Sequence, residues 1–136
     1  MNGVALLFTV GFWSLVFFRH MVPLPSELPS LIERSQAATT YGFMIADLLW
    51  SVPLLFLATL GLWRLRPWGW TAAQMVHALW LFSMTVIFVR DNYTAWSPGF
   101  VLFLVFPFIS VWATLYLWRQ RSLFWSKAAG DCMAGS

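Results

Sequence analysis

One carboxylate lies inside an otherwise apolar stretch of this chain. Asp47 falls within residues 41–63, a run long enough to cross a bilayer, and Ser51 follows it by four positions. Residues four apart share one face of a helix, so Asp47 and Ser51 predict a polar stripe that points inward. An ionisable group in such a segment is costly and marks a functional site by default. Asp47 and Ser51 are therefore the first candidates for a ligand or ion site.

The role of Asp47 depends on the cation that it meets. Arg19, near the end of the first apolar stretch, is within reach at the predicted depth. An Asp47–Arg19 ion pair would fix helix packing and do nothing else. In the alternative, Asp47 and Arg19 both line a site for a ligand or an ion. The sequence leaves both interpretations open.

A second polar position lies in the third apolar stretch. His77 follows Gln74 by three residues, and Ser110 and Thr114 of the fourth stretch are predicted near its level. A hydrogen bond to Ser110 would make His77 structural, and otherwise it is a polar wall of a pocket. No nucleophile–base pair, phosphate-binding loop or metal-ligand spacing appears in the sequence. We therefore predict neither a metal nor a cofactor.

Each apolar stretch carries one tryptophan near its middle: Trp13, Trp50, Trp80 and Trp112. Anchoring at the membrane interface does not explain this position. Such indoles either fill the core or wall a cavity for a flat apolar ligand, and an ammonium group can rest on their faces. Of these four tryptophans, two are predicted to contact a ligand: Trp50, which is near Asp47, and Trp80, which is near His77.

The elements that must position these residues are four membrane-spanning helices, predicted at about 3–22, 41–63, 70–89 and 100–118. About 20 apolar residues span a hydrocarbon core of roughly 30 Å. Hydrophobic residues make up 60% of the 136-residue chain and charged residues only 10%, against about a quarter charged in soluble domains. The fold class is therefore all-α: an integral membrane four-helix bundle over residues 1–122, with residues 123–136 as a short cytoplasmic tail.

Local signals refine these helices. Ser30 and Glu33 have the spacing of a capping box, so a helix is expected to start there and run into the second crossing. Pro53 is expected to kink that helix, because it removes a backbone donor and crowds the carbonyl of Leu49. Pro107 is expected to interrupt the fourth helix in the same way.

The distribution of basic residues predicts the orientation. With four crossings, the termini and the second turn share one side, which holds Arg64, Arg66, Arg119, Arg121 and Lys127. On the other side, Arg19, Arg34 and Arg90 are offset by Glu27, Glu33 and Asp91. The positive-inside rule then places both termini in the cytoplasm. This bias accounts for the basic composition, so no nucleic-acid partner is predicted.

Four short segments resemble the EXPERA superfamily of sterol isomerases and sigma-two receptors. They are Leu24-Pro25-Ser26-Glu27-Leu28, the run from Asp47 through Ser51 and Pro53 to Leu54, Met75-Val76-His77 followed by Asp91, and Phe106-Pro107 followed by Arg119. The resemblance implies a membrane bundle with a pocket for sterols and lipophilic amines. In it, Asp47 would be the pocket acid, Ser51 its neighbour and His77 a polar wall. Arg19 departs from the receptor pattern, which has a second acid there.

The expected function is binding of a hydrophobic small molecule within the bundle: a sterol-like or isoprenoid lipid, or a lipophilic amine. The expected ligand contacts are Asp47, Ser51, Trp50, His77, Trp80 and Arg19. Whether isomerase-type acid–base chemistry accompanies binding is left open. The alternatives are a small homodimeric transporter or channel that uses Asp47, and a non-catalytic accessory subunit of a larger membrane complex. The expected partners are the lipid bilayer and the small molecule.

Overall fold

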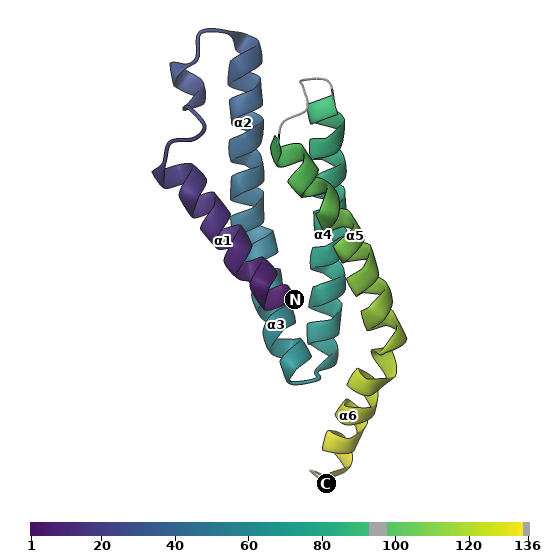
Figure 1. Cartoon of the computed structure of the whole chain (residues 1–136). Coiled ribbons are helices and arrows are strands. Elements are labelled where there is room, and N and C mark those ends of the chain that lie inside the picture. The colour runs from purple at the N-terminus through teal and green to yellow at the C-terminus, as the bar shows by residue number, and fades with distance from the viewer. Residues whose placement is uncertain (93–97, 135–136) are drawn as a thin grey trace. The chain divides into compact units, whose positions relative to one another are not determined.

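The computed structural model is helical throughout its described part, with no strand there (Figure 1). It describes the backbone of residues 1–92 and 98–134, and the side chains of residues 1–89 and 105–127. The side chains of Arg90 and Asp91, which enter the predicted charge balance of the outer side, lie outside the described residues. In chain order the elements are α1 (Asn2–Phe18), a short 3₁₀ turn η1 (Pro25–Glu27), α2 (Leu31–Ala46), a π-helical turn η2 (Asp47–Ser51), α3 (Val52–Trp63), α4 (Pro67–Asn92), α5 (Pro98–Arg119) and α6 (Arg121–Ala134). The all-α class is confirmed.

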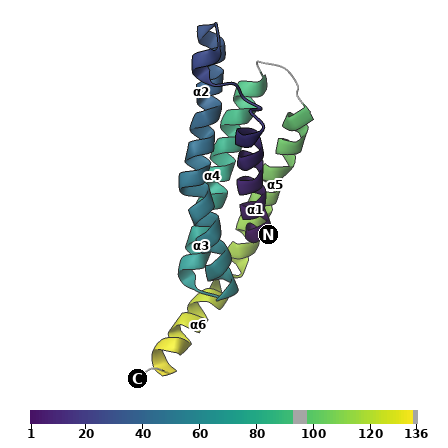
Figure 2. The same cartoon turned by 90° about the vertical axis from the view of Figure 1, so that its left-hand side faces the viewer.

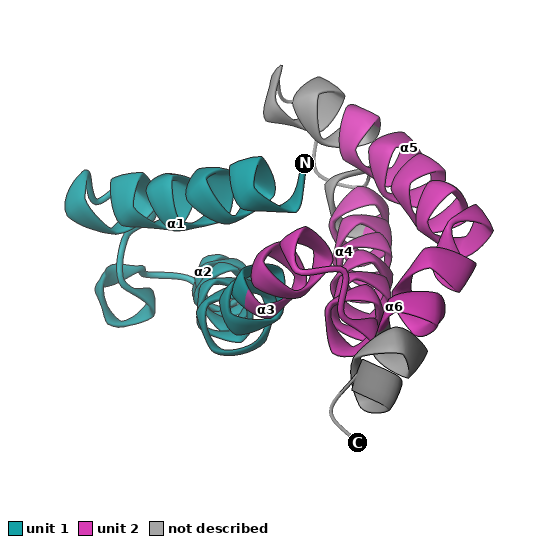
Figure 3. Cartoon of the chain, turned by 90° about the horizontal axis from the view of Figure 1, so that it is seen from below, with its two compact units in different colours: residues 1–56 teal, residues 57–136 magenta. Residues whose placement is uncertain are grey.

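The chain divides into two compact units, residues 1–56 and 57–136, with the boundary inside α3 (Figure 3). Each unit has its own packing and is described by itself. The four-helix bundle over residues 1–122 stays a prediction.

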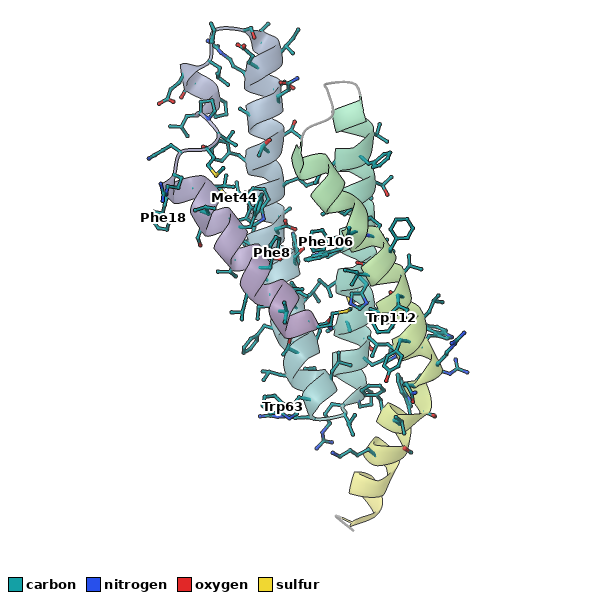
Figure 4. The ribbon with its side chains drawn as sticks, in the orientation of Figure 1. Phe8, Phe18, Met44, Trp63, Phe106 and Trp112 are labelled. Atoms are coloured by element: carbon teal, nitrogen blue, oxygen red, sulfur yellow. The ribbon has the colours of Figure 1, made fainter. Side chains whose placement is uncertain are left out.

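In the first unit, α1 packs on α2 through a small apolar core. Trp13, Val16 and Met44 are buried there, with Phe12 among the partly buried residues around them. Met44 lies between α1 and α2 in Figure 4. The hydroxyl of Tyr41 donates a hydrogen bond of 3.0 Å to the carbonyl of Val22. That bond ties the connection after α1 to the side of α2.

Helix α2 starts where the capping signal predicts. The Ser30 hydroxyl oxygen accepts a bond from the backbone N–H of Glu33 at 3.2 Å, and it donates to the Glu33 carboxylate at 2.8 Å. One continuous helix then runs from Leu31 to Trp63. It begins about ten residues before the predicted apolar crossing, because the cap at Ser30 satisfies the first free N–H groups and lets polar turns join the helix.

The two internal prolines have different outcomes. Before Pro53, residues Asp47–Ser51 form a π-helical turn in which the N–H of Val52 donates to the carbonyl of Asp47. The wider turn relieves the crowding that a proline ring causes in the preceding turn. Around Pro107, α5 runs without a break from Pro98 to Arg119. The helix is therefore not broken at Pro107, since a single missing hydrogen bond is tolerated in such a helix, and the predicted kink there stays a prediction.

The second unit contains a tight helical hairpin, formed by the end of α3 and the start of α4. Leu65 has a left-handed backbone, with φ of 52°. The N–H of Arg66 donates to the carbonyl of Gly61 at 2.8 Å, and that of Leu65 to Leu62 at 3.1 Å. This pair of bonds is a Schellman motif, which ends α3 just before Pro67 begins α4.

Helices α4 and α5 lie side by side in both views (Figures 1 and 2). Ala73 and Val76 of α4 and Ala113 of α5 are among the buried residues of this unit. Beyond α5, the predicted tail is instead the helix α6, Arg121–Ala134. Phe124 is 4% exposed and fixes the first turns of α6 to the unit, which explains why this segment is ordered as a helix.

Two helices of the described part are long and apolar enough to cross a membrane: Leu31–Trp63 and Pro67–Val89. Helix α1 is also apolar but shorter, at 17 residues. Large apolar side chains are exposed on the helices, among them Trp63 at the end of α3 and Trp112 on α5 (Figure 4). Length and composition therefore agree with membrane insertion.

Candidate functional site

The Asp47 carboxylate is held by two side-chain donors. The indole N–H of Trp13 donates to its Oδ2 atom at 2.9 Å, and the hydroxyl of Ser51 donates to its Oδ1 atom at 2.9 Å. Trp13 is 8% exposed and Ser51 3%, whereas Asp47 is partly buried. Hydrogen bonds to an ionised acceptor are stronger than neutral ones. The carboxylate is therefore fixed in one orientation.

The local fold explains this arrangement. Asp47 and Ser51 are the first and last residues of the π-helical turn, on the side of the helix that meets α1. The shared face of Asp47 and Ser51, predicted from their four-residue spacing, is confirmed by the hydrogen bond between them. Sequence reasoning missed Trp13 as the second partner. Its only signal is that Trp13 and Asp47 both lie inside their apolar stretches, away from the ends.

Arg19 is not the partner of Asp47, so the Asp47–Arg19 ion pair, one of the two interpretations that the sequence leaves open, does not form. Within the described residues, Asp47 is bonded by Trp13 and Ser51, and Arg19 is an exposed residue that ends α1. The reason is the length of α1. Arg19 lies beyond Trp13 by nearly two turns, roughly 9 Å along the axis. The chain then reverses at His20, whose φ is 47°, so Arg19 stays at the helix end.

Trp50 also lies apart from this cluster. It is 65% exposed, although Ser51 next to it is buried. The face of the helix that carries Asp47 and Ser51 meets α1, and Trp50 therefore points to the outside. Trp112 is similarly 62% exposed. The expectation that all four central tryptophans face the interior is wrong for these two.

His77 heads a second cluster, between α4 and α5. It is 5% exposed, and its Nδ1 atom lies 3.3 Å from the hydroxyl oxygen of Thr114. Ser110, one turn before Thr114, is 3% exposed. The side-chain amide nitrogen of Gln74, one turn before His77, is buried without a hydrogen-bond partner in the described part of the chain. The sequence predicts that Thr114 lies at the same depth as His77, and the contact between the two side chains confirms this.

Trp80 borders this second cluster. Its ring meets that of Phe106 edge to face, with centroids 5.5 Å apart. Trp80 follows His77 by three residues, so the two side chains are neighbours on α4. The apolar contact of Trp80 with Phe106 thus lies next to the polar contact of His77 with Thr114.

The predicted contacts divide between the two units. Asp47, Ser51, Trp50 and Arg19 belong to residues 1–56, and His77 and Trp80 to residues 57–136. Each described cluster holds one ionisable side chain, Asp47 in the first and His77 in the second. An acid–base pair is therefore not assembled within either cluster. Comparison with protein-family models, with curated proteins and with solved structures finds no match to this chain.

Proposed function

We propose that this chain is an integral membrane protein that binds a hydrophobic small molecule through the Asp47 carboxylate. The observation that carries the proposal is the orientation of that carboxylate by Trp13 and Ser51 within a membrane-length helix. π-helical turns occur frequently at functional sites. Ionisable groups in membrane helices also mark ligand or ion sites.

The chemistry of the carboxylate selects the ligand class. Its two oxygens offer about four acceptor positions, and Trp13 and Ser51 occupy two of them. The others suit an ammonium group or a hydroxyl of a ligand. A lipophilic amine fits best, because its positive charge complements the only carboxylate of the cluster, and a sterol-like hydroxyl comes second. The resemblance to the EXPERA superfamily supports the same assignment, since Asp47 corresponds to its pocket acid.

The proposed topology has four crossings, made by α1, by α2 through α3, by α4 and by α5, with both termini in the cytoplasm. It rests on the excess of basic residues at the α3–α4 turn and after α5. A reporter that is active only outside the cytoplasm should give no signal at the C-terminus. The same reporter inserted after Glu27 should be active. A strong C-terminal signal would contradict this orientation.

The ligand proposal is tested by Asp47→Asn, which keeps the volume of the side chain and removes its charge. Binding of a radiolabelled lipophilic tertiary amine to the purified protein should weaken about 10- to 100-fold, the loss of one charge-assisted contact. Ser51→Ala is the matched control, because it removes a donor to the same carboxylate and keeps the charge. Its effect should stay within about fivefold.

Two outcomes separate binding from structure. Equal amine affinity in the wild type and in Asp47→Asn would refute the ligand role. The double variant Trp13→Phe with Asp47→Leu removes a donor and the acceptor together, so it should fold and fail to bind. If it folds and binds normally, Asp47 is only a packing residue.

The exposed indoles of Trp50 and Trp112 favour a second candidate, in which the chain docks on another membrane protein or on a second copy of itself. Aromatic side chains are enriched where proteins meet. An accessory subunit, or a homodimer that transports through Asp47, is the function to adopt if no amine or sterol binds.

A further inference from the structure

Three tryptophans gather where α4 begins and α5 gives way to α6. The Trp70 ring lies 5.3 Å from that of Trp118 and 5.4 Å from that of Trp125, measured between centroids. The indole N–H of Trp70 donates to the carbonyl of Leu117 at 2.9 Å. This bond fixes the Trp70 ring and satisfies a carbonyl in the last turn of α5. The three rings therefore form a rigid aromatic corner.

An open pocket of about 360 Å³ lies against this corner, and the surface of its lining is almost wholly apolar. The indoles of Trp70 and Trp125 are its walls, with ring planes at 82° to each other, and Arg121 and Ser122 complete the lining. Because so little polar surface lines the pocket, Arg121 and Ser122 face it mainly with carbon atoms, as an arginine does when its stem covers apolar surface. The guanidinium carbon of Arg121 lies 5.6 Å from the centre of the Trp118 ring. The pocket therefore suits a hydrocarbon.

The pocket lies at one end of a membrane-length helix. Trp70 belongs to the first turn of α4, which starts at Pro67 and is long and apolar enough to cross a bilayer. The indoles of Trp63, Trp68 and Trp118, at the same end of this unit, are exposed. Tryptophan is enriched at the level of the lipid headgroups. In the proposed topology these indoles mark the membrane surface, so the pocket opens where the hydrocarbon core begins.

A stripe of exposed apolar side chains on α5 leads away from the corner. It consists of Val111, Leu115 and Trp118, whose spacing of four and three residues places them on one face of the helix. The stripe extends over roughly 10 Å of the helix axis. It ends at Trp118, whose ring contacts that of Trp70. An extended chain can follow the stripe from the pocket, whereas a compact ring system would use the pocket alone.

We propose that this pocket holds the upper part of one acyl chain of a bilayer lipid, whose remainder lies along the stripe. The pocket volume is near the lower end for small-molecule sites, about 300 to 1,000 Å³, which suits part of a lipid. Two rigid indole walls offer many dispersion contacts to methylene groups, each small and collectively large. Such packing distinguishes a bound chain from one in the surrounding bilayer, where the hydrophobic effect is nearly equal for both. Recognition is therefore by hydrocarbon and not by headgroup.

The test is native mass spectrometry of the full-length chain in detergent, titrated with three lipids. Dioleoyl phosphatidylcholine and dioleoyl phosphatidylglycerol have the same chains and different headgroups, so their affinities should agree within about twofold. Dihexanoyl phosphatidylcholine keeps the headgroup and shortens the chains, and its affinity should be about tenfold lower or less. A dioleoyl-like phosphatidylcholine with a diazirine on the upper acyl chain should crosslink to Trp70 or to residues 118–125.

Two serines of α6 provide a matched pair of variants. Ser122 lines the pocket and Ser126, one turn later, is absent from its lining, and both are exposed. Ser122→Trp should fill the pocket and lower the affinity for dioleoyl phosphatidylcholine about fivefold or more. Ser126→Trp adds the same indole elsewhere, so its effect should stay below about twofold. Trp125→Leu, which shrinks one wall, should lower the affinity about threefold.

The proposal rests on the membrane insertion proposed above but not on Asp47, so Ser122→Trp should leave amine binding unchanged. Equal affinity for the dioleoyl and dihexanoyl lipids would exclude selection by the chain. An equal loss in Ser122→Trp and Ser126→Trp would show that the pocket does not hold the lipid. Loss of the crosslink on addition of an equimolar sterol would assign the pocket to a flat ring ligand. If Ser122→Trp loses its helical circular dichroism, an unchanged affinity in Trp125→Leu is the overturning result.

Discussion

Gly61→Ala is expected to destabilise the chain by about 3 kcal/mol or more, with Gly69→Ala close behind, although each adds a single methyl group. The backbones of Gly61 and Gly69 touch where α3 and α4 meet. A Cβ on Gly61 would overlap the Cα of Gly69, and a Cβ on Gly69 would overlap the carbonyl carbon and Cα of Gly61. Backbone atoms cannot rotate away as a side chain can, so the helices would have to separate.

Gly42→Ala is the matched control. Gly42 lies inside α2, and a Cβ built there meets nothing within 4 Å. Alanine should therefore be neutral, or stabilise the helix by up to about 1 kcal/mol. The measurement is unfolding in mixed micelles followed by circular dichroism. Equal unfolding midpoints for Gly61→Ala and Gly42→Ala would show that the hairpin does not need the close approach.

Trp13→Ala is the second large effect, expected to cost about 2–4 kcal/mol. It removes a buried indole from the core with Val16 and Met44, and it takes a donor from Asp47. In a bilayer the lost side chain is replaced by lipid, so the hydrophobic transfer contribution is small and the packing contribution remains. The expected cost is therefore at or below that of aromatic truncation in a soluble core, about 3–5 kcal/mol.

Trp13→Phe separates the hydrogen bond from the packing. It keeps most of the ring and leaves Oδ2 of Asp47 without its donor, for an expected cost of about 1–2 kcal/mol. Trp63→Ala serves as the control, because Trp63 is 84% exposed and should contribute less than about 0.5 kcal/mol. The same micelle unfolding measurement applies. If Trp13→Phe matches the wild type, the Trp13–Asp47 bond carries no net stability.

Local features of this chain could be predicted from its sequence, and the orientation of helix faces could not. The cap of Ser30 on Glu33 and the pairing of Asp47 with Ser51 depend on residues within one turn, and both are confirmed. Which face points inward is normally read from the periodicity of apolar residues. Here nearly every position of the long helices is apolar, so that periodicity is weak. Trp50 was consequently placed inside and is in fact exposed.

The partner of Asp47 required tertiary information. Arg19 is a candidate from the sequence because it ends the first helix at a depth that Asp47 could share. In the structure Arg19 caps α1 and is exposed, and His20 after it has a left-handed backbone, unusual for a residue other than glycine. The indole of Trp13 then meets Asp47 from the neighbouring helix, a contact between residues 34 positions apart. No local pattern encodes such a distance.

The hairpin around Leu65 also bears on the order in which the chain is built. Its contacts join residues that are only eight positions apart, so closing it costs little loop entropy. Contacts of such short range form early, and synthesis proceeds from the N-terminus. The turn can therefore close as soon as the first residues of α4 leave the ribosome, before α5 exists. In the proposed topology, the two flanking membrane-length segments would then enter the bilayer as a preformed pair, with Arg64 and Arg66 on the cytoplasmic side.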